Sequence, residues 1–256
     1  MVPTMGALHA GHVALVARAK AAADRVIVTI FVNPLQFDQH ADFTGYPRPI
    51  DADLSLCRTA GVDAVYAPTA AEMYPPGFQT HVAPGALAER LEGPMRPGHF
   101  RGVTTVVLKL FAATQPDIAL FGQKDYQQLA IIRQMVVDLD LSVDIVGAPI
   151  VREPDGLALS SRNVRLTPSN RAEAVVISKS LAKAHDAWAA GEHNAAALTQ
   201  IARDEIASSR RAQLEYVELV DAVTLESIDD AGSGGVVLVA AWFGGVRLID
   251  NQLLER

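Results

Sequence analysis

Hydrophobic runs and amphipathic segments alternate along the first two thirds of the chain. The β-branched run at residues 26–32 is typical of a strand buried on both faces, and a helical pattern at 11–23 precedes it. Downstream the alternation predicts helices at 51–60, 103–113 and 126–139 and strands at 64–66, 118–121 and 143–146. Such alternation indicates right-handed crossovers and a doubly wound parallel sheet, with ligands bound at the carboxyl ends of its strands.

The pattern changes near residues 166–170. Thr167 is a suitable helix cap, because Pro168 follows it at the first helical position. Two Ala-rich helices are predicted at 168–190 and 194–208, followed by strands at 214–220, 236–241 and 246–249. We therefore expect two domains, an α/β domain over residues 1–166 and a smaller α+β domain over residues 167–256.

Composition narrows the class of protein. The 256 residues are 50% hydrophobic and 20% charged, as in an ordinary globular protein. We expect a cytoplasmic protein without a membrane partner, because no apolar run is long enough to span a bilayer and the first residues lack the features of a signal peptide. The single cysteine, Cys57, excludes an internal disulfide. A net charge of −7 argues against a nucleic-acid partner, so an anionic ligand requires cationic groups gathered locally.

The segment Met5-Gly-Ala-Leu-His-Ala-Gly-His12 is the most informative part of the sequence. His9 and His12 would lie on one face of the first turn of a helix, where unpaired amides and the helix dipole favour an anion. Ordinary helix-start histidines or two metal ligands are the alternatives. A zinc site needs further ligands at a recognisable spacing, and no such partner is evident nearby, so we assign no metal-binding residue. The motif alone therefore indicates a phosphate-binding site.

Two further polar clusters follow predicted strands of the α/β part. In the segment 33–37, Asn33 and Gln36 offer amides that donate and accept hydrogen bonds, although Asn33 before Pro34 is also a common way to end a strand. In the segment 121–128, Lys124 supplies a point charge for phosphate, and Asp125 is suited to ribose hydroxyls. A lone Lys-Asp pair is more often a solvated helix start.

A fourth polar cluster lies at residues 151–163. Ser160, Ser161 and Arg162 place two hydroxyls and a guanidinium in sequence on a loop that we expect to be mobile. This set is suited to holding phosphates during their transfer, but a Ser-Ser-Arg tripeptide means little by itself.

Taken together, the four clusters resemble a known family. The element at 6–12 looks like the HIGH-type signature of the nucleotidylyltransferase superfamily, and Leu159-Ser-Ser-Arg162 lies where its KMSKS-like loop would. More narrowly, the segments 3–9, 31–37, 121–128 and 155–163 resemble, in the same order, those of the pantoate–β-alanine ligase (pantothenate synthetase) family. The resemblance implies a Rossmann-like α/β domain with a C-terminal lid domain. It also implies ATP-dependent ligation of pantoate to β-alanine through a pantoyl adenylate, with release of pyrophosphate and AMP.

The resemblance also implies roles for individual residues. The catalytic set is His9, His12, Lys124 and Arg162, with His12 as the proton donor, and Gln36 and Gln128 bind pantoate, Gln36 also lying near β-alanine. The residues implied to bind ATP are Met5, Gly6, Ala7, Leu8, His9, Ala10, Gly11, His12, Gly122, Gln123, Lys124, Asp125, Val151, Leu159, Ser160, Ser161 and Arg162. Mg²⁺ is expected to arrive with ATP and to be held mainly by phosphate oxygens and water. A homodimer is expected from the family alone.

The chain also departs from the family pattern. Gln123 stands where members often have Glu, and Ala52 interrupts the acidic doublet near Asp51 and Asp53. Only Val2 to Thr4 precede the histidine motif, so the first strand is expected to be truncated and the edges of its neighbours exposed. Two alternatives therefore remain. One is a nucleotidylyltransferase that acts on a phosphorylated acceptor, and the other is a truncated, inactive nucleotide-binding homologue.

Overall fold

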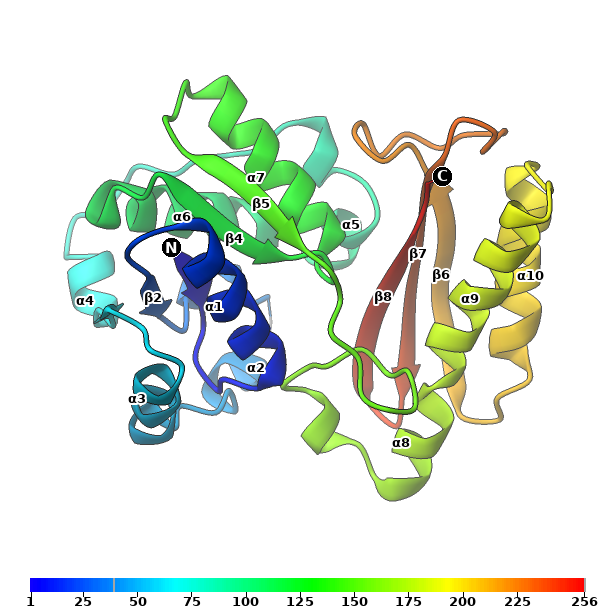
Figure 1. The fold of residues 1–256 in the computed structure, drawn as a ribbon, viewed down its shortest axis with the longest axis horizontal. Helices are drawn as coiled ribbons and strands as arrows, with labels where there is room; N and C mark the ends of the chain where they lie inside the picture. The colour runs from blue at the N-terminus through cyan, green and yellow to red at the C-terminus, as the bar shows by residue number, and fades with distance from the viewer. Residues whose placement is uncertain (39, 256) are drawn as a thin grey trace. The chain divides into compact units, whose positions relative to one another are not determined.

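The structure is a computed structural model that describes residues 1–38 and 40–255, and the chain forms two compact units, Met1–Pro149 and Ile150–Arg256 (Figure 1). The predicted domain boundary at residues 166–167 falls inside the second unit. Residues 150–166 belong with that unit because ion pairs tie them to it. Arg152 bonds to Asp250, 2.6 Å away, and Arg171 bonds to Glu153 and Asp155, each at 2.7 Å. None of the helices in the described residues is long and apolar enough to cross a membrane.

The first unit is built on parallel strands, with β1 (Val2–Thr4) paired to β2 (Ile27–Ile30), and β2 paired to β3 (Ala64–Tyr66). A second parallel pair joins β4 (Ile118–Gly122) to β5 (Asp144–Ala148). Main-chain hydrogen bonds of Met1 connect the two sets. Its nitrogen donates to the oxygen of Ile118 at 2.6 Å, and its oxygen accepts from the nitrogen of Leu120 at 3.0 Å. The strands therefore follow the order β3-β2-β1-β4-β5, which is a doubly wound arrangement.

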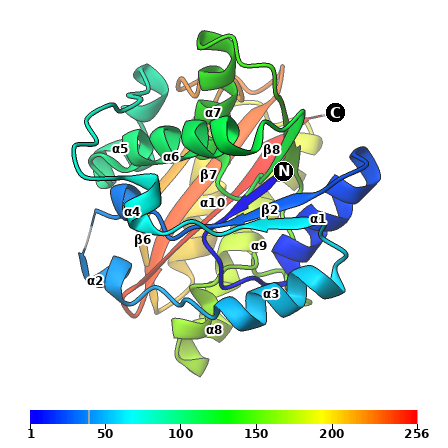
Figure 2. The same ribbon diagram turned by 90° about the vertical axis from the view of Figure 1, so that its left-hand side faces the viewer.

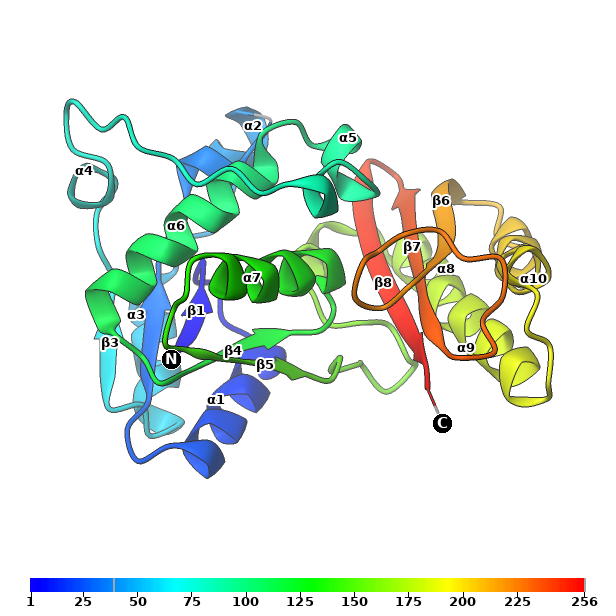
Figure 3. The same ribbon diagram turned by 90° about the horizontal axis from the view of Figure 1, so that it is seen from above.

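Helices cover both faces of this sheet. Figures 2 and 3 show α6 (His99–Thr114) and α7 (Tyr126–Asp138) on one face, with α1 (Ala10–Ala22) and α3 (Ile50–Thr59) on the other. The alternation of side chains along β4 explains this division. Ala119 and Phe121 pack with residues of α6 and α7, whereas Leu120 between them packs with residues of α1 and α3.

The second unit contains an antiparallel sheet with helices against it. Its helices are α8 (Pro168–Ala174), α9 (Val176–Ala189) and α10 (Ala195–Ala207), and its strands are β6 (Ala212–Val220), β7 (Gly235–Phe243) and β8 (Val246–Leu254). Figure 1 shows α9 and α10 along one face of this sheet, where Ile177, Leu198 and Val237 belong to one apolar core. The predicted fold class, α/β with a smaller C-terminal α+β part, is confirmed.

Several predictions of single elements need correction. The helix predicted at 168–190 is two helices that meet at Val175, and the short helices α2 (His40–Thr44), α4 (Ala70–Met73) and α5 (Glu92–Met95) were not predicted. The first strand is short, as expected, but β2 and β4 both bond to the segment that contains it. The expected exposed edges beside β1 are therefore not seen, and Val2 is fully buried.

Candidate active site

The histidine motif occupies the loop from β1 to α1 and the first turn of that helix. Gly6 and Ala7 both adopt the left-handed conformation, with φ of 77° and 50°. Asp53 of α3 receives the next main-chain donors, since its carboxylate accepts from the nitrogens of Ala7 at 2.9 Å and Leu8 at 2.8 Å. The loop is therefore held by a side chain that lies far from it in the sequence.

The two histidines cap the start of α1 through reciprocal hydrogen bonds. His9 is the N-cap residue, and its Nδ1 accepts a hydrogen bond from the nitrogen of Gly11 at 3.2 Å. In return, Nδ1 of His12 accepts from the nitrogen of His9 at 3.2 Å, and the ring centroids are 4.2 Å apart. Because Nδ1 is the acceptor in both rings, the neutral form of each ring carries its proton on Nε2.

Both rings are neutral near pH 7. Burial lowers the pKa of His9, and the ammonium of Lys124 lowers it further. Burial also lowers the pKa of His12 to about 3, with a further contribution from His9 and an opposing one from Asp125. Four main-chain N–H groups of this turn already donate hydrogen bonds to side chains of the protein, namely those of Ala7, Leu8, His9 and Gly11. With these four amides in use, the Nε2 hydrogens of the two histidines become the main donors that this turn offers an anion, whereas the sequence predicted free amides there.

The third motif joins β4 to α7. Gly122 is the last residue of β4, Asp125 is the N-cap of α7, and the nitrogen of Gln123 donates to the oxygen of Ala148 at 2.8 Å. A Cβ atom added to Gly122 would meet no atom of the described residues within 4 Å, so this backbone is open to close approach. Because β4 is hydrogen-bonded to the segment that contains β1, this motif follows a strand next to the one that leads into the histidine loop, and Lys124 and Asp125 both influence the histidine pKa values.

The second motif lies in the 3₁₀ turn η1 (Pro34–Gln36) after β2 and touches the histidine loop. Nε2 of Gln36 donates to Sδ of Met5 at 3.1 Å. The buried Asn33 orients Gln36, since its Nδ2 donates to Oε1 of Gln36 at 3.0 Å and to the oxygen of Gly102 at 3.1 Å. Oδ1 of Asn33 accepts from the hydroxyl of Tyr74 at 2.7 Å. Asn33 is thus both the strand-ending residue expected from the sequence and a support for Gln36.

The two adjacent glutamines of α7 differ in their surroundings. Gln127 is buried, and its Nε2 donates to the oxygens of Leu87 and Arg90, both at 2.7 Å, while its Oε1 accepts from the nitrogen of Glu92 at 2.9 Å. Gln128 is half-buried, and its amide has no hydrogen-bond partner within the described part of the chain. Gln128 is therefore the glutamine available to a ligand.

His99 and Arg96 form a second support for Gln36 that the sequence analysis missed. Nδ1 of the buried His99 lies 2.8 Å from the main-chain oxygen of Gln36, and Nη1 of Arg96 lies 3.1 Å from Nε2 of His99. Burial and the Arg96 guanidinium lower the pKa of His99 to about 4. Neither residue lies in one of the four motifs, so only the fold reveals their role.

The fourth motif lies in the second unit and forms a tight hairpin. The nitrogen of Leu159 donates to the oxygen of Val151 at 2.9 Å, and Gly156 turns the chain with a φ of 98°. Beyond the hairpin, Oγ of Ser160 accepts from the nitrogen of Arg162 at 3.2 Å, with Ser161 half-buried between them. The structure thus brings Val151 and the Ser-Ser-Arg segment together. Their position relative to the first three motifs stays a prediction.

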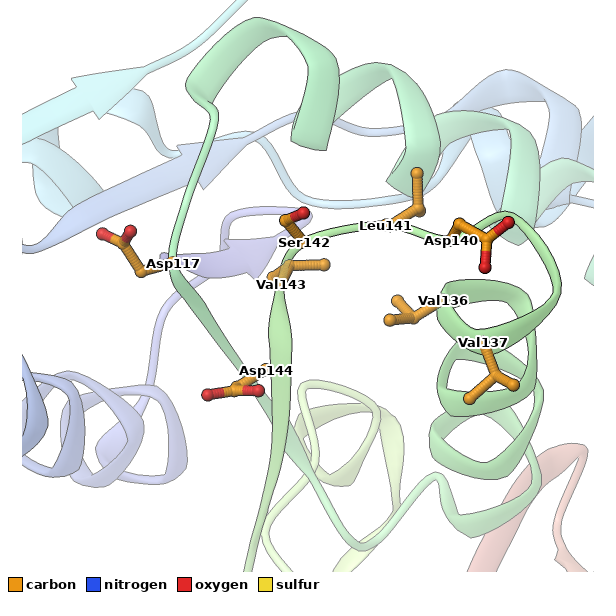
Figure 4. A pocket seen from close by; sticks show the side chains of 8 residues that line it. All are labelled: Asp117, Val136, Val137, Asp140, Leu141, Ser142, Val143 and Asp144. Carbon is orange, nitrogen blue, oxygen red and sulfur yellow. The ribbon is translucent and has the colours of Figure 1, made fainter.

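The carboxyl ends of the strands in the first unit therefore gather three of the four motifs. A separate pocket lies at the opposite ends of β4 and β5 and is lined by Asp117, Asp144 and residues of the segment 136–143 (Figure 4). It contains none of the predicted site residues, and the carboxylates of Asp117, Asp140 and Asp144 would repel a nucleotide. The carboxyl ends remain the candidate active site.

Comparisons with known proteins agree with this arrangement. The sequence model of the family described as pantoate-beta-alanine ligase matches residues 1–253. The pantothenate synthetases of Heliobacterium modesticaldum and Chloroflexus aggregans are 51% and 53% identical to the chain over 254 residues. The alignments cover 99% of this chain and 90% and 92% of those proteins.

Solved structures show the same likeness in three dimensions. The pantothenate synthetase of Thermus thermophilus superposes with a TM-score of 0.96 at 44% identity, covering 100% of this chain and 92% of that one. The pantoate-beta-alanine ligase of Francisella tularensis, solved in complex with beta-gamma ATP and β-alanine, gives a TM-score of 0.81 at 37% identity, with coverage of 100% and 89%. The family expected from the motifs, and with it the ligase class of enzyme, is confirmed: the chain belongs to the pantoate–β-alanine ligase family.

Proposed function

We propose that the chain ligates pantoate to β-alanine at the expense of ATP, through a pantoyl adenylate. The observation that carries the proposal is the contact of 3.1 Å between Nε2 of Gln36 and Sδ of Met5. It joins the amide assigned to pantoate with the loop that delivers the two histidines. The pantoate carboxylate and the ATP phosphates would therefore be bound side by side in the first unit.

The chemistry requires two transfers. A carboxylate oxygen of pantoate attacks the α-phosphorus of ATP, the bond from that phosphorus to the bridging oxygen breaks, and pyrophosphate leaves with the electron pair. The neutral amine of β-alanine then attacks the acyl carbon and loses a proton, and AMP leaves as the C–O bond breaks. Adenylation is needed because a free carboxylate has no competent leaving group.

We assign the histidines as neutral hydrogen-bond donors. Negative charge grows on the departing pyrophosphate, and fixed donors aimed at it lower the barrier. The Nε2 hydrogens of His9 and His12 and the ammonium of Lys124 would supply these donors. The low pKa of His12, about 3, supports donation from a neutral ring over the general-acid role implied by the resemblance. The family resemblance also assigns Ser160, Ser161 and Arg162 to the phosphates.

The amides of Gln36 and Gln128 suit a hydroxy acid. An amide donates to a carboxylate and accepts from a hydroxyl without adding a charge that would compete with the phosphates. Asn33 supports Gln36 in this role because it holds Oε1 of Gln36 and leaves Nε2 directed toward the histidine loop. Gln128 keeps both ends of its amide for the ligand within the described residues.

Mg²⁺ would accompany ATP. The described residues contain no group of three or more His, Cys, Asp or Glu side chains suited to a metal ion, and both oxygens of Asp53 already accept main-chain hydrogens. The donor set therefore fits an ion held by phosphate oxygens and water, with Asp125 as a nearby carboxylate. When bound, the ion would neutralise part of the phosphate charge.

The homodimer is expected from family membership alone, and the cytoplasmic location is kept as the expectation from the sequence. A homodimer in the cytoplasm is the expected state, and light scattering coupled to size-exclusion chromatography measures the mass directly. Closure of the second unit over the adenylate, which must be kept from water, is proposed on the same footing. Solution scattering with and without ATP and pantoate tests that closure.

Product release tests the ligase directly. With ATP and pantoate alone, one equivalent of pyrophosphate should be released per active site, and continuous AMP release should require β-alanine as well. Pyrophosphate release that is indifferent to pantoate would contradict the proposal. Release stimulated by a phosphorylated acceptor in place of pantoate would support the nucleotidylyltransferase alternative instead.

A further inference from the structure

Asp53 is a buried carboxylate for which the proposed reaction has no use. It lies in the first turn of α3 and is only 3% exposed. Within the described residues no basic side chain forms an ion pair with it. Its two oxygens instead accept one main-chain hydrogen each, Oδ2 from Ala7 and Oδ1 from Leu8. A buried charge is costly unless hydrogen bonds or a counter-charge satisfy it, and for Asp53 the two main-chain N–H groups do so.

The backbone that Asp53 contacts is strained. Gly6 and Ala7 are consecutive residues with positive φ, and alanine rarely adopts this conformation. The turn directs the successive amides of Ala7 and Leu8 at one point, which forms an anion-binding concavity of main-chain donors. In this protein the anion in the concavity is a side chain of the same chain. The carboxylate therefore compensates the strain of the turn.

The fit between Asp53 and the turn is tight. A Cβ atom added to Gly6 would lie 2.8 Å from Oδ2 of Asp53 and 3.1 Å from Cγ2 of Ile30. The turn can therefore approach the carboxylate only because residue 6 is a glycine. One residue beyond the second amide, the chain reaches His9 and the first turn of α1, so any shift at Asp53 moves both imidazole rings.

We propose that Asp53 is a positioning residue for the nucleotide site. Its carboxylate accepts the hydrogens of the Ala7 and Leu8 amides, as a bound anion would, and so fixes the turn that leads to His9 and His12. The phosphates are thereby excluded from these two amides and directed to the Nε2 hydrogens. This inference rests on the proposed function, since it assigns the histidines to ATP.

Amide exchange in the unaltered protein tests the first half of the inference without any activity. The amides of Ala7 and Leu8 should exchange at least about tenfold more slowly than unprotected amides, because each donates to a buried carboxylate. Addition of β,γ-methylene ATP should leave their protection unchanged. Protection that appears only with the analogue would mean that phosphate takes these amides, and it would overturn the inference.

Asp53→Asn tests the second half, with Asp51→Asn as the matched control on the exposed side of the same turn. Asn keeps one acceptor oxygen and replaces the other with a donor that opposes a main-chain N–H. We expect the KM for ATP to rise about tenfold or more, while the KM for pantoate changes less than about threefold. The control should match the unaltered enzyme.

The outcomes separate this inference from the proposed function. If Asp53→Asn is folded and matches the control, or if it loses ATP and pantoate affinity equally, Asp53 has no positioning role for the nucleotide. If Asp53→Asn does not fold, the exchange measurement on the unaltered protein decides. If the unaltered enzyme and the control both fail to use pantoate, the proposed function fails, whatever the exchange result.

Discussion

Nδ1 of His99 lies 2.8 Å from the main-chain oxygen of Gln36 and holds the turn that carries this glutamine. The carbonyl requires a donor, so the neutral ring carries its proton on Nδ1. Arg96 donates to the other ring nitrogen at 3.1 Å, and a proton added there would displace this bond. A histidine fixed at both nitrogens is a rigid part of the candidate active site, and it makes the stability of that region depend on pH.

Acidification should weaken the fold through His99. The pKa of His99 is about 4 in the folded protein and near 6.5 in the unfolded chain, so its contribution to stability is present above pH 6.5 and lost as pH falls toward 4. Between pH 7 and 5 this amounts to on the order of 2 kcal/mol of unfolding free energy. Urea titrations of the unaltered protein and His99→Gln should show a smaller pH dependence in the variant. Equal slopes would contradict the assignment.

His12 should act without ionising. Because its pKa is about 3, the profile of kcat/KM for ATP should show no ionisation of His12 from about pH 6 to 8. His12→Ala should lower kcat by about 10²–10³-fold, and His12→Gln, which keeps an N–H donor, should retain at least about tenfold more activity than His12→Ala. His12→Ala also loses the acceptor for the nitrogen of His9, at a cost of about 1 kcal/mol, whereas the side-chain oxygen of Gln can replace it. A fall in activity with rising pH that disappears in His12→Gln would favour general-acid catalysis.

Gly102→Ala should be destabilising although it lies inside a helix. An exposed helical glycine gains about 1 kcal/mol when it becomes alanine. At Gly102 the new Cβ would lie 2.2 Å from the oxygen of Leu35, so α6 and η1 must separate. We expect a loss of about 3 kcal/mol and a higher KM for pantoate, because Asn33 and Gln36 lie in the displaced turn. Denaturant unfolding measures the first effect, and a gain in stability would contradict the close approach.

Gly122→Ala should raise the KM for ATP without changing the stability of the fold. The added Cβ would meet no atom of the described residues within 4 Å, so the unfolding free energy should change by less than about 0.5 kcal/mol. If ATP approaches this backbone, its KM should rise about tenfold, equivalent to about 1.4 kcal/mol. Steady-state kinetics with ATP and with pantoate as the varied substrate measure this difference. An unchanged KM for ATP would remove Gly122 from the nucleotide site.

The ion pair between Arg152 and Asp250 should contribute far more to the stability of the fold than a surface pair does. Asp250 is 3% exposed, so Arg152→Ala leaves a buried charge without its partner and should cost about 3 kcal/mol. Arg25→Ala is the matched control, because the Arg25 side chain is 83% exposed and its pair with Asp63 is screened by solvent. Thermal unfolding of both variants measures the contrast. Equal shifts would mean that burial does not govern the Arg152 pair.

The elements that sequence reasoning predicted well are those with long or β-branched patterns. Residues 26–32, 118–121 and 126–139 correspond to β2, β4 and α7 within a few residues. The helices α2, α4 and α5 have four or five residues, which is too short for a hydrophobic period to appear. The break at Val175 has no sequence signal, since Val175 is itself buried in the core.

The site residues also differ in whether the sequence alone can predict them. The histidine and lysine motifs are local in sequence, so their chemistry could be recognised before the fold was known. The support from Asp53 to Leu8 spans 45 positions, and that from His99 to Gln36 spans 63. Gln127 and Gln128 are identical neighbours, and only the packing of the helix decides that Gln127 is structural. Local chemistry could thus be predicted, whereas long-range support could not.

The place of β1 between β2 and β4 has a consequence for synthesis on the ribosome. Its first edge can pair as soon as β2 emerges, but the partner of its other edge is made 117 positions after Met1. At about 5–20 residues per second, this edge stays open for on the order of ten seconds. A nascent chain with an open strand edge is a substrate for aggregation and for chaperones. The step that closes the nucleotide-binding sheet is therefore late, and we expect it to limit the yield of folded enzyme.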